Sequence, residues 1–201
     1  MKKLLTVLLC MIMALSFAAC GGDSGNSDQG GGDSSKAVEY KVDPEATTLT
    51  ISDGSTQKEY TADELKKLGT EKNTYSGRNK KVQNARFFEE YEGVDLRTLL
   101  KDAGFKTDGA SMKVVCSDGY TREYYVDELY GKYAFEDNDS DKKKEVDPII
   151  AVVDSDEDSE YPSPFKLVYG QADYDTYTND SQDYNVQGWG SYIQYIEVSY
   201  K

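Results

Sequence analysis

The chain has 201 residues, with 37 acidic and 23 basic side chains, three cysteines and no histidine. The absence of histidine excludes a Ser-His-Asp triad, a Cys-His pair, an imidazole zinc site and a histidine-ligated haem. The net charge of -14 disfavours nucleic acid as a partner, because that affinity comes mainly from Lys and Arg side chains on phosphates.

The first 19 residues have the features of an export signal. Lys2 and Lys3 form a basic start, and an apolar run follows that ends in two small residues. This run is too short for a stable membrane span. Cleavage would leave Cys20 at the start of the mature chain. Residues 17–20 resemble the lipobox of bacterial lipoproteins, in which this thiol is lipidated. An ordinary secreted protein with a chance cysteine is the alternative.

Residues 20–36 predict a lipidated cysteine followed by a flexible tether of Gly, Ser and Asp. Such a coil has a root-mean-square reach of about 20–25 Å. Several lipids on Cys20 would anchor the chain stably, so the membrane is an expected partner. The expected location is therefore the extracytoplasmic face of the cell membrane. Because Cys10 leaves with the signal, Cys116 has no partner for a disulfide in the mature chain.

The folded domain is predicted over residues 37–201, and it begins with a strand pair and a short helix. Residues 47–52 alternate before an Asp-Gly turn, and residues 58–60 form the returning strand. Thr61 and Glu64 fit a capping box, in which each side chain satisfies a free backbone N–H at the start of a helix.

Two extended segments and a second helix follow. Residues 71–91 are predicted to be extended on both sides of a polar turn at 77–81. Asp95 is a good N-cap for a helix that stops at Gly104. The buried face of this helix is expected to consist of Leu96, Leu99 and Leu100.

The second half of the domain is predicted to be mostly strand. Residues 112–126 give the clearest hairpin signal, with an Asp-Gly turn at its centre. A helical turn at 127–129 precedes two short apolar strands at 149–153 and 165–169, and an alternating strand covers 191–200. Short helices among many strands predict an α+β domain with a mostly β core.

Several short motifs occur in a characteristic order across residues 47–199: TADELKKLG, TYSGRN, GVDLRTLLKDAG, VVCSDGY, PIIAVV, PFKLVYG and IQYIEV. This order resembles the molybdopterin-binding oxidoreductase domain of the sulfite oxidase type, in its small exported bacterial lipoprotein version. The resemblance implies a sulfite-oxidase-like fold with a cleft for a pterin cofactor. It also implies that the pterin dithiolene and one protein cysteine bind molybdenum, a metal that suits a soft thiolate.

When the sequence is aligned on the glycine of TYSGRN, Tyr75 stands at the position of the metal-binding cysteine. Ser76, Arg78 and Asn79 complete this segment, and Lys166 replaces an arginine of the family motif. The resemblance makes these five residues the candidate cofactor-binding set. With the thiolate and all histidines missing, the sequence leaves open whether the protein is an enzyme.

These residues also have simpler interpretations. The basic residues 78–81 can form a solvated turn, and Tyr75 can be an ordinary packed side chain. Cys116 alternates with Met112 and Val114 on one face of a predicted strand. This pattern predicts a buried thiol that behaves as a small apolar side chain.

Two aspartate-rich runs, residues 137–141 and 154–158, resemble the opening of a calcium loop. Both runs lack the glycine and the glutamate that complete a helix–loop–helix calcium site. A weak extracellular Ca²⁺ site and a solvated acidic loop are the two interpretations.

The stretch 169–189 is rich in aromatic side chains and is a candidate ligand-binding loop. Aromatic platforms stack on sugars or other flat ligands. The alternative is a long loop pinned by rings whose polar ends stay in water. The candidate residues are Tyr174, Tyr177, Tyr184 and Trp189.

The sequence therefore predicts a lipid-anchored extracytoplasmic protein with a molybdopterin-oxidoreductase-like domain. Without the molybdenum thiolate, this domain would act as a ligand-binding or interaction module for an unidentified small molecule or protein. The alternative is an exported molybdopterin-dependent oxidoreductase component. Molybdopterin is implied only by the resemblance.

Overall fold

The computed structural model describes residues 40–79, 85–135, 142–153, 160–170 and 189–200, with the backbone alone at 78–79, 85–86 and 135. These residues belong to one compact unit of the chain, Lys36–Lys201. They form eleven strands and three short helices. This composition confirms the prediction of a mostly β domain with short inserted helices.

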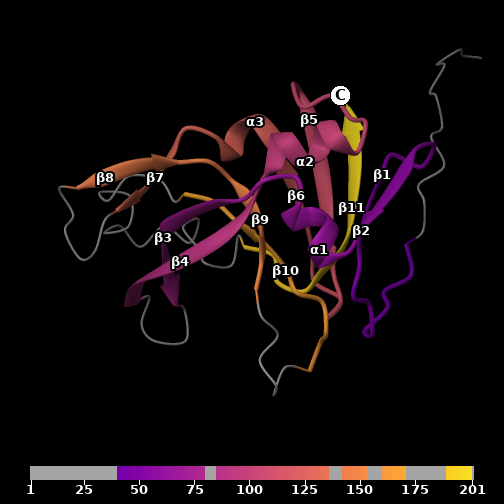
Figure 1. The fold of residues 1–201 in the computed structure, drawn as a ribbon, viewed down its shortest axis with the longest axis horizontal. Coiled ribbons are helices and arrows are strands. Elements are labelled where there is room, and N and C mark those ends of the chain that lie inside the picture. Colours follow the sequence, from indigo (N-terminus) through magenta and orange to yellow (C-terminus); the bar gives the residue numbers. More distant parts are fainter. Residues whose placement is uncertain (1–39, 80–84, 136–141, 154–159, 171–188, 201) are drawn as a thin grey trace, which may run out of the picture. The chain divides into compact units, whose positions relative to one another are not determined.

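One sheet has five strands: β1 (Leu49–Ser52), β2 (Gln57–Tyr60), β5 (Ala110–Cys116), β6 (Thr121–Tyr125) and β11 (Ile193–Tyr200). Their spatial order is β2-β1-β11-β5-β6 (Figure 1). β1 and β11 are parallel, and the other neighbours are antiparallel. The last strand of the chain therefore lies at the centre of this sheet.

The second sheet has four strands: β3 (Glu71–Asn79), β4 (Ala85–Asp95), β9 (Ile149–Val152) and β10 (Phe165–Val168). Their order is β10-β9-β4-β3, and all neighbours are antiparallel. This sheet carries the candidate site described below.

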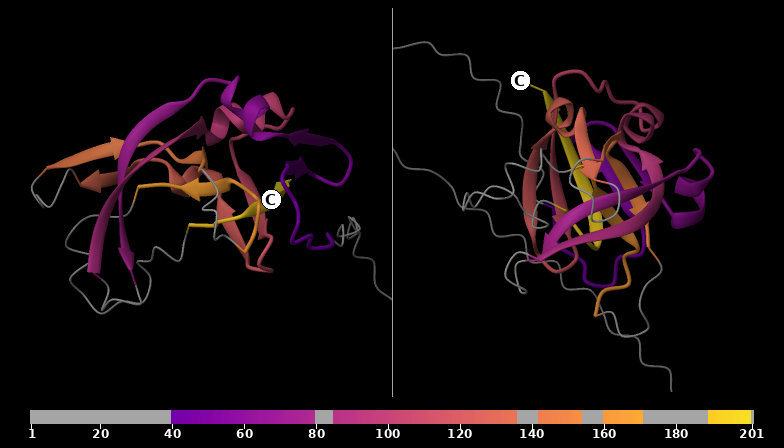
Figure 2. Two further views of the ribbon diagram at one scale, coloured as in Figure 1. Left: turned by 60° about the horizontal axis from the view of Figure 1, so that its bottom comes forward. Right: turned by 90° about the vertical axis from the view of Figure 1, so that its left-hand side faces the viewer.

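A separate two-stranded ribbon is formed by β7 (Lys132–Phe135) and β8 (Lys143–Val146). The ribbon and the β1–β2 hairpin lie at opposite ends of the domain (Figure 1, Figure 2). The three helices are α1 (Ala62–Lys66), α2 (Leu96–Asp102) and α3 (Val126–Leu129).

Two helix starts confirm their sequence signals. The Thr61 side chain accepts from the N–H of Glu64, and the Glu64 carboxylate accepts from the N–H of Thr61, as in a capping box. At α2, the Asp95 carboxylate accepts from the N–H of Thr98 at 2.8 Å. The predicted leucines of this helix are buried.

Two predicted features differ from the structure, and one element was not predicted. Residues 77–79 were expected in a turn, but they pair with Ala85–Phe87 as the end of the β3–β4 hairpin. The last strand begins at Ile193, because Tyr192 has a positive φ of 57° that an extended strand cannot accommodate. The β7–β8 ribbon was missed, because its exposed polar positions give no apolar alternation.

Two clusters of buried side chains lie on opposite faces of the four-stranded sheet. Successive side chains in a strand point to opposite faces. Ile150 and Leu167 belong to the main core, which also takes side chains from the five-stranded sheet and all three helices. Their neighbours Ile149 and Ala151 in β9, and Val168 in β10, belong to a second, aromatic cluster.

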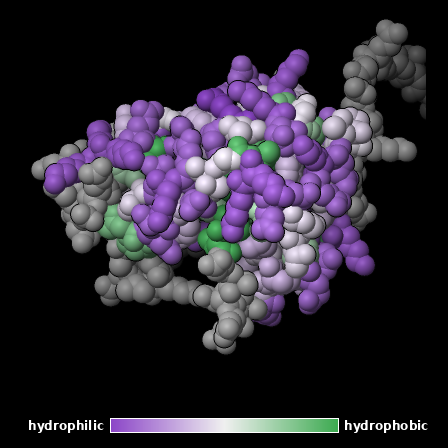
Figure 3. All heavy atoms as spheres, viewed as in Figure 1, coloured by the Kyte–Doolittle hydropathy of each residue, from purple (hydrophilic) through white to green (hydrophobic). Residues whose placement is uncertain are grey.

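One face of the domain is largely polar. The face in Figure 3 is mostly hydrophilic, and its hydrophobic residues form small separate patches. Within the described segments, no helix is long and apolar enough to cross a membrane. The large exposed aromatic residues of these segments are three tyrosines, Tyr120, Tyr125 and Tyr200.

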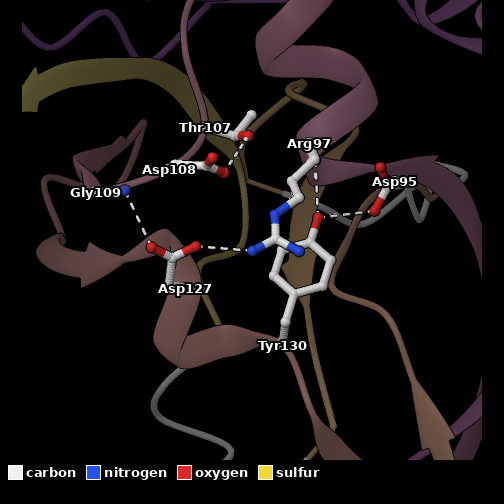
Figure 4. Close-up of polar contacts among 7 residues, drawn as sticks. All are labelled: Asp95, Arg97, Thr107, Asp108, Gly109, Asp127 and Tyr130. Carbon is white, nitrogen blue, oxygen red and sulfur yellow. Dashed lines mark hydrogen bonds and ion pairs between the residues drawn. The ribbon is translucent and has the colours of Figure 1, made fainter.

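A polar clamp joins α3 to the start of α2 (Figure 4). The Tyr130 hydroxyl donates to the Asp95 carboxylate and accepts from the backbone N–H of Arg97, both at 2.8 Å. The Arg97 guanidinium carbon lies 3.8 Å from the centre of the Tyr130 ring. The same guanidinium contacts Asp127 at 2.7 Å, and Asp127 accepts from the N–H of Gly109 at 3.0 Å. The clamp satisfies a free N–H at the start of α2.

We predict that Gly93→Ala destabilises the domain by about 3 kcal/mol, because the new Cβ would overpack a strand pair. This Cβ would lie 2.6 Å from the Cα of Ala151 and would also clash with the carbonyl oxygen of Ile150. Gly69→Ala is the control, since its Cβ would meet nothing within 4 Å and only the positive φ is strained, at a cost of about 1 kcal/mol. Denaturant unfolding of both variants measures this difference, and equal losses would contradict the packing argument.

We also predict that the contribution of Asp127 to stability depends on pH. The N–H of Gly109 and the Arg97 guanidinium lower the pKa of this carboxyl in the folded state. Its contribution is therefore fully present above the unfolded pKa of about 3.9 and is lost as the pH falls through the folded value. Asp127→Asn should lower the free energy of unfolding at pH 7, and the difference from wild type should close below about pH 4. A difference that stays constant over this range would show that the carboxylate charge is irrelevant.

Candidate functional site

The aromatic cluster on the four-stranded sheet contains one lysine. Lys166 lies in β10 opposite Ala151 of β9, and Ala151 lies opposite Gly93 of β4. These three positions share one face of the sheet. Tyr91, two residues before Gly93 in β4, projects from the same face, and the Lys166 side chain reaches its hydroxyl.

A chain of hydrogen bonds links the lysine to a carboxylate. The Lys166 ammonium donates to the Tyr91 hydroxyl oxygen at 2.6 Å. The Tyr91 hydroxyl in turn donates to the Glu89 carboxylate. Glu89 and Tyr91 are two residues apart in β4, so both side chains project from the same face. The Tyr91 phenol therefore bridges the amine and the carboxylate through two hydrogen bonds.

Trp189 forms the aromatic wall of this site. The Lys166 nitrogen lies 5.4 Å from the Trp189 ring centre and 4.5 Å from that of Tyr91. The rings of Tyr75, Phe87 and Tyr91 pack almost perpendicular to the indole, with centroids 5.6–6.5 Å away. Its Nε1 donates to the carbonyl oxygen of Tyr169 at 3.1 Å. Because Trp189 is only 5% exposed, its ring does not offer an open stacking platform.

Burial sets the protonation behaviour of the lysine. Desolvation lowers the pKa of Lys166 below its ordinary value, because the charged form loses hydration, and the charge of Glu89 only partly opposes this. At a given pH, a larger fraction of Lys166 is therefore neutral than of a lysine with the ordinary pKa.

Tyr75 is fully buried and does not present a metal ligand. Its hydroxyl donates to the carbonyl oxygen of Asp147 at 2.9 Å. Burial raises the pKa of this phenol above its ordinary value, so the phenolate form that a metal would require is disfavoured. The position that the sequence resemblance assigns to the molybdenum ligand is thus occupied by a neutral packed side chain.

Cys116 does not supply the thiolate that the sequence resemblance implies. It is buried in the main core beside Met112 and Val114, as its alternation predicts. Burial raises the pKa of this thiol to about 12, so it is protonated at neutral pH. Across the described segments, no group of three or more Cys, Asp or Glu side chains is arranged to hold a metal ion. These residues do not fit the molybdenum centre that the resemblance implies.

Three of the residues singled out in the sequence, Tyr75, Lys166 and Trp189, lie together in this site. Ser76 points to the opposite face of β3, and its buried hydroxyl has no hydrogen-bond partner among the described residues. Arg78 and Asn79 lie in β3, but their side chains are not described. The remaining candidates, together with the two aspartate-rich runs, lie outside the described residues: Cys20, Tyr174, Tyr177 and Tyr184.

Sequence reasoning missed Glu89, Phe87 and Tyr91. Their spacing of two residues in an extended segment places them on one face. The signal that was lacking is the pairing of β4 with β9 and of β9 with β10, which brings this face next to Lys166.

No protein-family model and no curated protein matches the sequence. Among solved structures, the domain is similar to the sulfane dehydrogenase SoxCD from Paracoccus pantotrophus, with a TM-score of 0.49 and 14% sequence identity. The match covers 81% of this chain and 40% of that chain, so this chain spans well under half the length of its structural neighbour. The similarity is distant.

The single tryptophan of the chain provides a direct probe of this site. We predict that Trp189 fluorescence changes as Lys166 loses its proton, with a midpoint below the ordinary lysine pKa of about 10.4, because removing a nearby cation alters the indole environment. Lys166→Met should abolish this transition, whereas Lys113→Met, at an exposed position of β5, should retain it. A transition that persists in Lys166→Met would show that another group causes it.

Proposed function

We propose that this protein is an extracytoplasmic lipoprotein, anchored through Cys20, whose domain acts as a ligand-binding module. The order of its motifs resembles the sulfite-oxidase-type molybdopterin domain, and we propose that the domain keeps this architecture without the molybdenum chemistry. The observation that carries the proposal is the Lys166–Tyr91–Glu89 chain within an aromatic cluster, beside a buried Tyr75.

The chemistry of the side chains supports binding over metal-dependent oxidation. Molybdenum in this type of site needs a soft thiolate. Tyr75 offers a neutral phenol, and the Cys116 thiol is protonated and packed in the other cluster. A few polar groups within a mostly aromatic surround are instead typical of sites for small organic molecules.

The charges of the site indicate what kind of molecule it would accept. Lys166 supplies one ammonium and Glu89 one carboxylate, joined through Tyr91, so their charges nearly cancel. The surrounding rings make the site largely apolar. We therefore propose a small organic ligand with a single polar group directed at Lys166.

The start of the described chain supports a tethered arrangement. The Tyr40 ring stacks on Tyr195 of β11 with ring centres 3.8 Å apart. The N–H of Asp43 donates to the Gln194 side chain at 2.9 Å. The chain is thus attached to the central strand by residue 40, which leaves residues 21–39 as the connection to a lipidated Cys20.

The full-length chain, produced in a bacterium that synthesises molybdopterin, tests both parts of the proposal. Wild type should carry fatty acid and fractionate with membranes, Cys20→Ser should lose both properties, and the control Cys116→Ser should keep them. Purified wild type should hold no stoichiometric molybdenum or pterin. Stoichiometric molybdenum with pterin would instead establish the exported oxidoreductase component, and fatty acid on Cys20→Ser would overturn the anchor.

A further inference from the structure

We propose that Lys166 is a nucleophilic amine that holds a small aldehyde or ketone covalently, as an imine. This inference deepens the proposed function and rests on it, because it names the ligand class of the same site. It is carried by the arrangement of Lys166, Tyr91 and Glu89, and by the rings that surround them.

The hydrogen bonds leave the lone pair of a neutral amine unused. Tyr91 gives its own proton to Glu89, so toward Lys166 its oxygen acts as an acceptor. The amine therefore contributes an N–H to this contact and keeps its lone pair. Among the described residues, Tyr91 is the single hydrogen-bond partner of the Lys166 nitrogen. The electrons needed for attack on a carbonyl carbon are available.

Lys166 differs from the lysines that form ion pairs. Lys72 contacts the Glu90 carboxylate directly at 2.6 Å, and this hydrogen bond raises the pKa of the lysine. Lys166 meets a neutral phenol, and the carboxylate lies one hydrogen bond further away. Desolvated lysines of this kind serve as Schiff-base nucleophiles in other proteins.

The charges of the site favour a neutral carbonyl compound over an anion. Within the described part of the chain, Lys166 is the one cation that lies over the rings of Tyr91 and Trp189. A free carboxylate or phosphate would meet this single ammonium and the opposing charge of Glu89. An uncharged aldehyde or ketone avoids this repulsion.

The reaction balances without an oxidant or a reductant. The Lys166 nitrogen attacks the carbonyl carbon, a C–N bond forms, and the carbonyl π electrons move to oxygen, which takes a proton. The resulting carbinolamine loses this oxygen as water, while nitrogen releases its remaining proton and the C=N bond forms. Tyr91, 2.6 Å from the nitrogen, is placed to pass these protons to and from Glu89.

Benzaldehyde with sodium cyanoborohydride, added to the full-length lipoprotein in detergent, tests the inference. Peptide mass spectrometry locates and times the reduced adducts. Lys166 should be labelled at least about tenfold faster at pH 7 than the exposed Lys113, because more of it is neutral at this pH. The rate at Lys166 should also reach its plateau at a lower pH. Tyr91→Phe should slow labelling of Lys166 while leaving Lys113 unchanged.

Two unreactive analogues separate this inference from the proposed function. Benzyl alcohol and benzoate have the same ring but cannot form an imine, and their binding is followed by Trp189 fluorescence. If either one binds and Lys166 is labelled no faster than Lys113, the covalent inference is overturned and the binding module stands. If no analogue binds in wild type and labelling shows no preference, both proposals fail for this site. Lys166→Arg, which keeps the positive charge, should eliminate the fast adduct.

Discussion

The close pairing of β4 with β9 is the constraint on which both clusters depend. Gly93 faces Ala151 so closely that no side chain fits at position 93. This register directs Ile150 into the main core and Ala151 toward the aromatic cluster. A slip by one residue would exchange the two faces, so it would bury the Lys166 side of the sheet in the main core. The pairing of Gly93 with Ala151 therefore positions both the main core and the Lys166 site.

Burying an amine costs free energy unless a partner compensates for its lost hydration. A direct carboxylate would stabilise the charged form of the amine more strongly. The intervening Tyr91 gives only partial compensation, because a phenol is a weaker partner than an anion. The amine therefore keeps a hydrogen bond while its pKa falls. The rings of Tyr91 and Trp189 lie beside the amine and favour a nearby cation. Burial thus shifts Lys166 toward its neutral form, which is the nucleophilic form of an amine.

Local signals in the sequence were sufficient for most elements and insufficient for the site. Thr61 and Asp95 identify their helix starts, because a cap depends only on residues within one turn. The β7–β8 ribbon has no clear alternation of apolar residues to predict it. The contact between Lys166 and Tyr91 joins residues that lie 75 positions apart in the chain. No local pattern encodes such a register. Tyr75, Lys166 and Trp189 were found one by one, and only the sheet order shows that they are neighbours.

The Tyr75 side chain has packing and hydrogen-bonding roles of its own. It packs edge-on against Trp189 and tilted against Tyr91, and its hydroxyl ties β3 to the chain before β9. Replacing it with cysteine would remove the ring and leave a cavity in the cluster, together with an unpaired carbonyl oxygen at Asp147. A thiolate created in this way would also be desolvated and so disfavoured, as the thiol of Cys116 already is. A single substitution to cysteine would therefore not create a metal-binding thiolate at this position, because the surrounding rings are arranged around a neutral phenol.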